Sequence, residues 1–256
     1  MKIIIIVEDT KKENSFESEH GLSVYFEINN KKIMFDLSQS SMFLRNAKKL
    51  NIGLSDINYL VFSHGHYDHT GGFSSFPLNK NLKIIAHPDS ILPKYAGERY
   101  IGFPIDKTDS EIDFNDEPVW LTESCIFLGT IPGERKASLG YYIKDNMAYD
   151  DFLIDDTALV IRDKKKLLII TGCAHSGIIN IVKYAKQFFN ENKIIIIGGF
   201  HMSKFTEKEI KNTIEELKKQ GVAKVFPGHC TGDKAIKAII NSIGGEQLYS
   251  GKIIEV

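Results

Sequence analysis

The stretch SHGHYDH at residues 63–69 gathers side chains that commonly bind metal ions. Three of the chain's eight histidines, His64, His66 and His69, lie here with Asp68, directly after an apolar run. His64 and His66 are two positions apart, so in an extended or turning segment both imidazoles point the same way and can reach one ion. Asp68 and His69 lie past the bend and can turn toward a second ion.

Neutral imidazoles and a carboxylate are typical ligands of zinc, or of a similar ion such as iron or manganese. An ion held by three or four protein ligands keeps a position for water and lowers the pKa of that water to about 7. The stretch therefore predicts half of a two-metal site with a metal-held hydroxide as nucleophile. The alternative is a polar turn that happens to be rich in histidine, but the pattern HxHxDH followed by Thr-Gly-Gly is more specific than such a turn requires.

Three later histidines stand where a predicted strand meets a turn. They are His175 in IITGCAHSG, His201 in IIIIGGFHM and His229 in VFPGHCTG. Side chains at the carboxyl ends of strands in an open α/β sheet gather at one edge. Any one of these histidines could equally be a satisfied core residue, but three in the same position favour a shared site with the first cluster.

Short β-branched runs bounded by polar turns predict the strands that position these side chains. In the first half of the chain they lie at 3–7, 22–28, 31–37, 59–63 and 82–87. Asn29-Asn30 suggests a hairpin between the second and third of these strands. Apolar residues at helical spacing after Ser41, with Gly53 as a stop, predict a helix before the fourth.

The second half of the chain alternates more regularly. We expect a hairpin over 157–172, a helix from Ser176, strands at 193–199 and 223–229, a helix over 206–221, a third helix over Asp233–Ile243, and two short final strands. Thr206 and Glu209 form a capping box at the start of the second of these helices. Strands that alternate with helices indicate an α/β architecture, and two such halves suit a sandwich of sheets with helices outside.

Residues 88–156 do not follow this alternation. They hold five prolines and the only tryptophan, Trp120, without clear periodicity. A long irregular insertion in a compact domain is most often a functional lid or binding loop. A surface excursion held by its own aromatic side chains is the alternative.

Composition limits the classes of partner. Lys plus Arg number 32 and Asp plus Glu number 33, so a formal charge of −1 offers no basic excess for nucleic acid or an anionic membrane. The three cysteines form no CxxC pair, which argues against a disulfide framework and a cysteine-based zinc knuckle. No segment approaches the ~20 apolar residues of a membrane span. We expect a cytoplasmic protein with a small-molecule partner.

The residues SHGHYDHTGG, the later PGH and the order of hairpins and helices resemble the metallo-β-lactamase superfamily over essentially the whole chain. The resemblance implies an α/β fold, a four-layer αβ/βα sandwich with a one- or two-metal site at the sheet edges. It also implies a single domain over 1–256 with a lid-like insertion at about 88–156. More narrowly, the segments FESEHGLSVYFE, DDTALVI, TGCAHSGIINIV, GGFHM and FPGHCTG resemble the subfamily of 7,8-dihydropterin-6-ylmethyl-4-(β-D-ribofuranosyl)aminobenzene 5'-phosphate synthases.

The resemblance also implies roles for individual residues. The expected ligands are His64 and His66 for the first ion, and Asp68, His69 and His229 for the second. The superfamily's further histidine before the second hairpin is missing here, so we expect His175 to complete the first site, with Cys173, Asp155 or Asp156 as alternatives. Asp36, Asp156 and Cys173 are candidates for orienting the ligands.

Three further residues are expected near the substrate. His201 is not needed as a ligand, so we expect it to bind substrate or to donate a proton to the leaving group; with Asp68 it is our candidate catalytic residue. Arg135 is the candidate grip for an anionic group, because guanidinium forks match phosphate oxygens. His20 resembles the subfamily's N-terminal loop and is expected to line the pocket.

These expectations support a two-metal hydrolase of a phosphate ester or another anionic small molecule, with zinc as the first choice of metal. The alternative is the subfamily's synthase activity, in which pyrophosphate leaves and aromatic side chains such as Tyr95, Phe103 or Trp120 stack on a pterin. A redox protein with iron is disfavoured, because related diiron flavoproteins have a glutamate in place of His66 and the chain has no flavin domain. A binding module without catalysis is disfavoured by the complete ligand set. The sequence does not indicate an oligomeric state.

Overall fold

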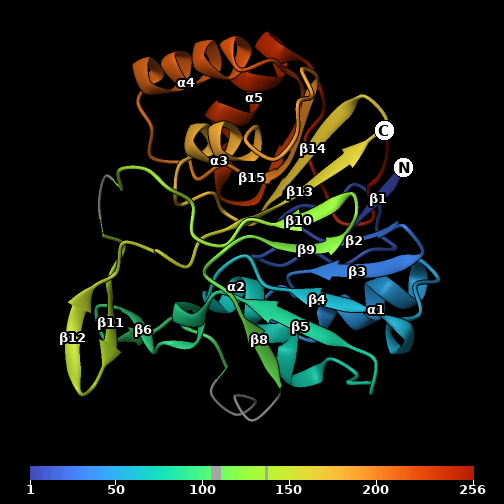
Figure 1. The fold of residues 1–256 in the computed structure, drawn as a ribbon, viewed down its shortest axis with the longest axis vertical. Coiled ribbons are helices and arrows are strands. Elements are labelled where there is room, and N and C mark those ends of the chain that lie inside the picture. The colour runs from blue at the N-terminus through green and yellow to red at the C-terminus, as the bar shows by residue number, and fades with distance from the viewer. Residues whose placement is uncertain (105–110, 136–137) are drawn as a thin grey trace.

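Two large β-sheets face each other in the computed structural model, which describes residues 1–104, 111–135 and 138–256 (Figure 1). The first part of the chain contains β1 (Lys2–Val7), β2 (Ser23–Ile28), β3 (Lys31–Phe35), α1 (Met42–Lys49), η1 (Leu54–Asp56), β4 (Tyr59–Val61), α2 (Tyr67–Thr70), η2 (Gly71–Ser75), β5 (Lys83–Ala86) and η3 (Pro88–Ile91). These strands join β8 (Ile112–Phe114) and β17 (Ile253–Glu255) in a 7-stranded sheet of order β17-β1-β2-β3-β4-β5-β8. The expected hairpin is confirmed, since Asn29 and Asn30 turn between β2 and β3 with φ of 49° and 58°.

The second part of the chain builds the other large sheet. Its elements are β9 (Val119–Thr122), β10 (Cys125–Phe127), β13 (Ala158–Asp163), β14 (Lys166–Thr171), α3 (Ile178–Ala185), β15 (Ile194–Gly199), α4 (Glu207–Lys219), β16 (Val222–Gly228), η5 (His229–Thr231) and α5 (Asp233–Ile243). They form a 6-stranded sheet of order β16-β15-β14-β13-β10-β9, in which β14, β15 and β16 are parallel neighbours. The capping box of Thr206 and Glu209 at the start of α4 is confirmed. One strand, β17, ends the described chain where two were expected, because Gly245 and Ser250 make only isolated bridges.

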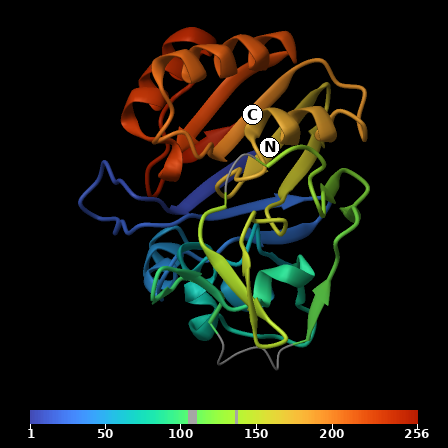
Figure 2. The ribbon, with the colours of Figure 1, turned by 90° about the vertical axis from the view of Figure 1, so that its left-hand side faces the viewer.

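The central strands are buried on both sides, which explains their unbroken apolar runs. Alternate residues of β13, β14 and β15 pack under α3, α4 and α5: Ala158, Val160, Leu167, Ile169, Ile194 and Ile196. The residues between them face the 7-stranded sheet: Leu159, Ile161, Leu168, Ile170, Ile195 and Ile197. On the far side of the 7-stranded sheet, Phe43 and Ala47 of α1 pack against Met34 and Leu60. The result is the expected four-layer αβ/βα sandwich, with helices outside both sheets (Figures 1 and 2).

The segment expected as an irregular insertion at about 88–156 holds more regular structure than its prolines suggested; residues 105–110 and 136–137 of it lie outside the described residues. Strands β8, β9 and β10 belong to the two large sheets. A 4-stranded sheet of order β12-β11-β6-β7 projects from the body of the molecule in Figure 1. Its strands are β6 (Lys94–Ala96), β7 (Arg99–Tyr100), β11 (Tyr141–Lys144) and β12 (Met147–Asp150).

Burial decides the expectation for Phe103. Phe103 was expected to stack on a pterin, but it is only 1% exposed and packs edge-on against Phe62 and Phe73 in the core. That expectation is wrong, because a core side chain cannot offer a face to a ligand.

No helix among the described residues has both the length and the apolar character needed to cross a membrane.

A buried lysine connects the 4-stranded sheet to the histidine loop. Lys94 of β6 is 1% exposed, and its Nζ lies 2.9 Å from Asp151 Oδ2 and 3.0 Å from Asp155 Oδ1. Burial opposes the charge of Lys94, but Asp155 and Asp151 outweigh it and raise the pKa of the ammonium group. The other oxygen of Asp155 accepts the backbone N–H of Gly65 at 2.7 Å. Gly65 lies between His64 and His66, so this ion pair holds the loop that carries both imidazoles.

Replacing Lys94 with methionine leaves two carboxylates buried without their cation. Removal of one partner from a buried ion pair typically costs about 3–5 kcal/mol. We expect Lys94→Met to lower the free energy of unfolding by that amount, measured by urea denaturation at neutral pH. The matched control is Lys234→Met, which breaks the exposed pair with Glu207 and should cause no measurable loss. Equal losses in the two variants would contradict the role given to the buried pair.

Candidate metal centre

The histidine loop runs from the end of β4 into the short helix α2, at the edge where the two large sheets meet. His66 is the residue before α2 and keeps an extended backbone, with φ −74° and ψ 145°. A Cβ on Gly65 would lie 1.9 Å from the carbonyl oxygen of Ser90, so only glycine lets the loop pass this close to η3. The loop therefore turns His64 and His66 inward on either side of a glycine that packs against the neighbouring chain.

His64, His66 and His175 form the first ligand set. His64 Nε2 lies 3.1 Å from His66 Nδ1 and 3.2 Å from His175 Nε2. Burial lowers the pKa of all three imidazoles, that of His66 to about 4, so they are neutral at pH 7. Nitrogens that bind one tetrahedral zinc ion at ordinary bond lengths are about 3.4 Å apart. Three neutral rings that converge in this way fit a divalent cation.

The structure places His175, rather than the alternatives, beside His64 and His66. Asp155 is bound by Lys94 and Gly65. Asp156 accepts the N–H and the hydroxyl of Ser176, at 2.9 and 2.5 Å, so it holds the residue that follows His175 rather than its imidazole. Among the described residues, neither aspartate belongs to a group whose ligand atoms converge.

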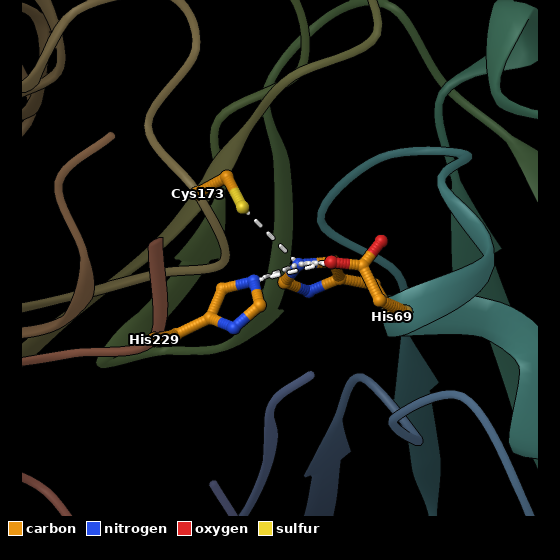
Figure 3. Close-up of side chains that lie close together, drawn as sticks. His69, Cys173 and His229 are labelled. Atoms are coloured by element: carbon orange, nitrogen blue, oxygen red, sulfur yellow. Dashed lines mark hydrogen bonds and ion pairs between the residues drawn. The ribbon is translucent and has the colours of Figure 1, made fainter. Parts of the chain in front are cut away.

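Asp68, His69, Cys173 and His229 form the second ligand set. His69 Nε2 lies 3.2 Å from both Cys173 Sγ and His229 Nε2, and Figure 3 shows these three side chains pointing toward one another. His229 Nε2 is also 3.2 Å from Asp68 Oδ2. Cys173, expected as an alternative ligand of the first site or as a partner that orients the ligands, thus lies among the second set. The ring centroids of His64, in the first set, and His69, in the second, are 4.3 Å apart, so the two sets are adjacent.

Charge around His229 favours a cation. Burial lowers the pKa of His229, but hydrogen bonds with Asp68 and Asp9 outweigh it and hold this pKa well above its usual value. Its Nδ1 lies 2.7 Å from Asp9 Oδ1. Because the Asp9 carboxylate accepts a hydrogen bond from the Nδ1–H of His229, the Nε2 atom, beside Asp68, is the position that attracts a further proton or a metal ion.

Asp36 orients one ligand of each set. Its Oδ2 lies 2.7 Å from His69 Nδ1 and accepts the hydroxyl of Ser63 at 2.7 Å. The same hydroxyl lies 2.9 Å from His64 Nδ1. Asp36 has a positive φ of 58°, which aspartate and asparagine tolerate better than most residues. These are the contacts that an orienting role of Asp36 requires, and the role itself stays a prediction.

Sequence reasoning missed the acidic pair at the end of β1. Glu8 accepts the backbone N–H of His229 at 2.6 Å, and Asp9 accepts the N–H of Gly21 at 3.0 Å in addition to its contact with His229. Both residues follow the apolar run of β1, as the first histidines follow β4. The position at a strand end was therefore the signal that could have identified them.

The three residues expected near the substrate differ in their surroundings. His20 is half-exposed, and its Nε2 lies 3.3 Å from Asp68 Oδ2. The ring of His201 is 4.2 Å from that of His175. Arg135 donates to the carbonyl oxygen of Ile131 at 3.2 Å, and its buried Nη1 has no partner among the described residues. The structure thus brings His20 and His201 to the ligand sets, while Arg135 makes no hydrogen bond or ion pair with these sets among the described residues.

The family model of the metallo-beta-lactamase superfamily matches residues 19–229, a span that includes both ligand sets. The chain belongs to this superfamily. Its members typically bind divalent metal ions, and the two convergent sets fit such ions in donor type and spacing.

Relatives within the superfamily match the whole chain. An uncharacterized protein of Methanocaldococcus jannaschii is 36% identical over 265 residues, covering 99% of this chain and 100% of that protein. The 7,8-dihydropterin-6-methyl-4-(beta-D-ribofuranosyl)-aminobenzene-5'-phosphate synthase of the same organism is 33% identical over 283 residues, covering 100% and 96%. The crystal structure of Tm1679, a metal-dependent hydrolase of the beta-lactamase superfamily, matches with a TM-score of 0.89 and 33% identity, covering 100% and 99%.

The contacts of Asp36 predict a specific effect on metal affinity. In an Asp36→Asn variant the new amide keeps the shape of the side chain and tolerates the positive φ, but it no longer provides a carboxylate for His69 Nδ1. Loss of such a partner typically weakens metal binding by about 10–100-fold. We expect Asp36→Asn to lower the affinity of the second set by that factor, measured by competition with a chromophoric chelator. The control is Asp145→Asn, which changes an exposed turn residue with a similar φ of 51°. Unchanged affinity in the Asp36→Asn variant would refute the orienting role.

Proposed function

We propose that this protein is a two-metal-dependent hydrolase of a phosphate ester or another small anionic molecule. The observation that carries the proposal is the pair of adjacent ligand sets, which share Asp36 as an orienting group. His64, His66 and His175 would hold one ion, and Asp68, His69, Cys173 and His229 the other. Imidazole and thiolate together suit zinc best, with iron as an alternative and manganese a poorer match for the thiolate.

Bound divalent ions would supply Lewis-acid chemistry, polarising a phosphoryl oxygen and lowering the pKa of water. The chain's own contribution is to fix the ions and to place groups around the substrate. His201 would donate a proton to the leaving group, because its ring lies against His175 at the edge of the first set. His20 would line the other side, next to Asp68.

Arg135 has one feature that supports its assignment to an anionic group. Burial lowers the pKa of its guanidinium group, although Asp156 and Asp155 oppose that shift. A buried Nη1 without a partner has a hydrogen bond left to give. We propose that this bond goes to a phosphate or carboxylate oxygen of the substrate.

The second candidate is the synthase activity, which joins a dihydropterin methyl pyrophosphate to an arylamine with loss of pyrophosphate. The supporting observation is the 33% identity to the synthase of M. jannaschii over all of this chain. In that reaction the same ligand sets would hold ions that neutralise the departing pyrophosphate. Tyr95 of the 4-stranded sheet is only half-buried, and it is the candidate for stacking on the pterin with the ring face that does not stack on Tyr141.

The two candidates separate on the need for a second substrate. We expect the zinc-loaded protein to release product from members of a phosphomonoester and phosphodiester panel without any arylamine, measured by phosphate and chromophore release. Turnover that requires both the pterin pyrophosphate and the arylamine would favour the synthase instead. Inactivity toward the panel and toward that pair would contradict both proposals.

A histidine variant tests the metal dependence. His64→Ala removes the imidazole that contacts both other members of the first set. Since a catalytic ion contributes several kcal/mol, we expect kcat/KM to fall on the order of 10³-fold or more. The control is His87→Asn, whose side-chain oxygen can still accept the N–H of Asp89 as His87 does, and whose position is outside both ligand sets. Full activity in His64→Ala would eliminate the proposed centre.

A further inference from the structure

Three neighbouring parallel strands are each followed by a side chain that can bind a metal ion such as zinc. Strands β14, β15 and β16 end at Thr171, Gly199 and Gly228. Two residues after these ends stand Cys173, His201 and Cys230, respectively. In the parallel ladder Gly199 pairs with Gly228, and Thr171 pairs with Gly198. The ladder therefore brings the two thiols and the imidazole to one point at the sheet edge.

The ligand atoms of these three residues lie within 4.8 Å of one another. Cys230 Sγ lies 3.5 Å from the carbonyl oxygen of Cys173, which draws it toward the second ligand set. A Cβ on Gly199 would come within 2.7 Å of Cys230 Sγ, so glycine provides the space in which this thiol sits. His201 Nδ1 is buried and has no hydrogen-bond partner among the described residues.

Of these three side chains, only Cys173 also belongs to the second set. The metal centre proposed above does not use Cys230, and it uses His201 only as a proton donor. Two sulfurs that bind one tetrahedral zinc ion are about 3.8 Å apart. Since the ligand atoms of this group already lie within 4.8 Å of one another, small side-chain movements would let them bind one ion. Two thiolates and an imidazole form a ligand set that prefers thiophilic cations to magnesium or calcium.

We propose that Cys173, His201 and Cys230 bind a third, thiophilic divalent cation such as Zn²⁺ or Cd²⁺. The ion shares the sulfur of Cys173 with the ion of the second set and takes its other protein ligands from the residues that follow β15 and β16. A bound third ion occupies the imidazole of His201, so that this group is no longer free to give a proton. Binding of excess metal at this site would therefore inhibit the hydrolase reaction proposed above. The existence of the binding site does not depend on that reaction.

Cadmium binding tests the third site directly, because cadmium–thiolate bonds absorb in the ultraviolet. The apoprotein is titrated with CdCl₂, and bound cadmium is counted by equilibrium dialysis with elemental analysis. We expect wild type to bind three ions and to show absorption from both thiolates. Cys230→Ser should bind two ions, with the absorption of Cys173 alone. The matched control is Cys125→Ala, which changes a fully buried thiol of β10 outside the ligand sets and should still bind three ions.

Wild-type protein gives a second measurement that does not depend on how the variants fold. The ¹¹³Cd NMR spectrum of the cadmium-saturated protein should contain three resonances, one of them in the range of sites with two sulfur ligands. The proposal would be overturned if the spectrum never contained more than two resonances. It would also be overturned if wild type and Cys230→Ser had the same cadmium content and the same absorption. Inhibition by excess zinc that is relieved in Cys230→Ser would support it.

Discussion

The buried carboxylate of Asp36 is the group through which the histidine loop, α2 and the end of β14 are held together. It is fully buried, so each of its hydrogen bonds must be made to a protein group. Its partners are the N–H and hydroxyl of Ser63 and the Nδ1 of His69. A Cβ on Gly172 would lie 2.0 Å from the Ser63 hydroxyl, so the end of β14 packs directly on this network. The position of Cys173, one residue further, is fixed by the same contact.

The two ligand sets differ in charge, although they are neighbours. The first consists of imidazoles that burial keeps neutral, whereas the second includes Asp68, whose pKa is well below its usual value despite burial. His69, His20 and His229 outweigh the effect of burial on the pKa of Asp68, and Asp9 adds a further negative charge beside His229. An ion held by the first set would keep its full double charge, while one held by the second would be largely neutralised. Two ions bound there would therefore attract an anion with different strength.

Much of the fold and of the ligand arrangement could be predicted from the sequence, because both depend on local patterns. Apolar runs gave the strands, and α5 has the expected bounds, Asp233–Ile243. Every residue expected as a ligand lies in one of the two ligand sets. The place of Cys173 could not be derived in the same way, since the side of a strand end on which a thiol points depends on contacts with β4 and β15.

The 4-stranded sheet was missed for a physical reason. Its strands are only two to four residues long, and β12 is exposed at every position, so neither length nor alternating burial identifies them. Asp9 and Glu8 were missed because their partner His229 is more than two hundred residues away in sequence. Their position at a strand end marked both residues, but a contact of this range depends on the tertiary fold, so the sequence did not identify their partner.

The separation of the ligands along the chain has a consequence for how the protein forms and persists. His69 and His229 are 160 residues apart, and His64 and His175 are 111 apart. In the unfolded chain these side chains are scattered, so an ion that joins them binds only after both sheets have met. The ion then acts as a reversible cross-link between the two halves of the molecule, comparable to a bridge that closes a long loop. Supply of metal would thereby control how long the folded protein survives, in addition to what it catalyses.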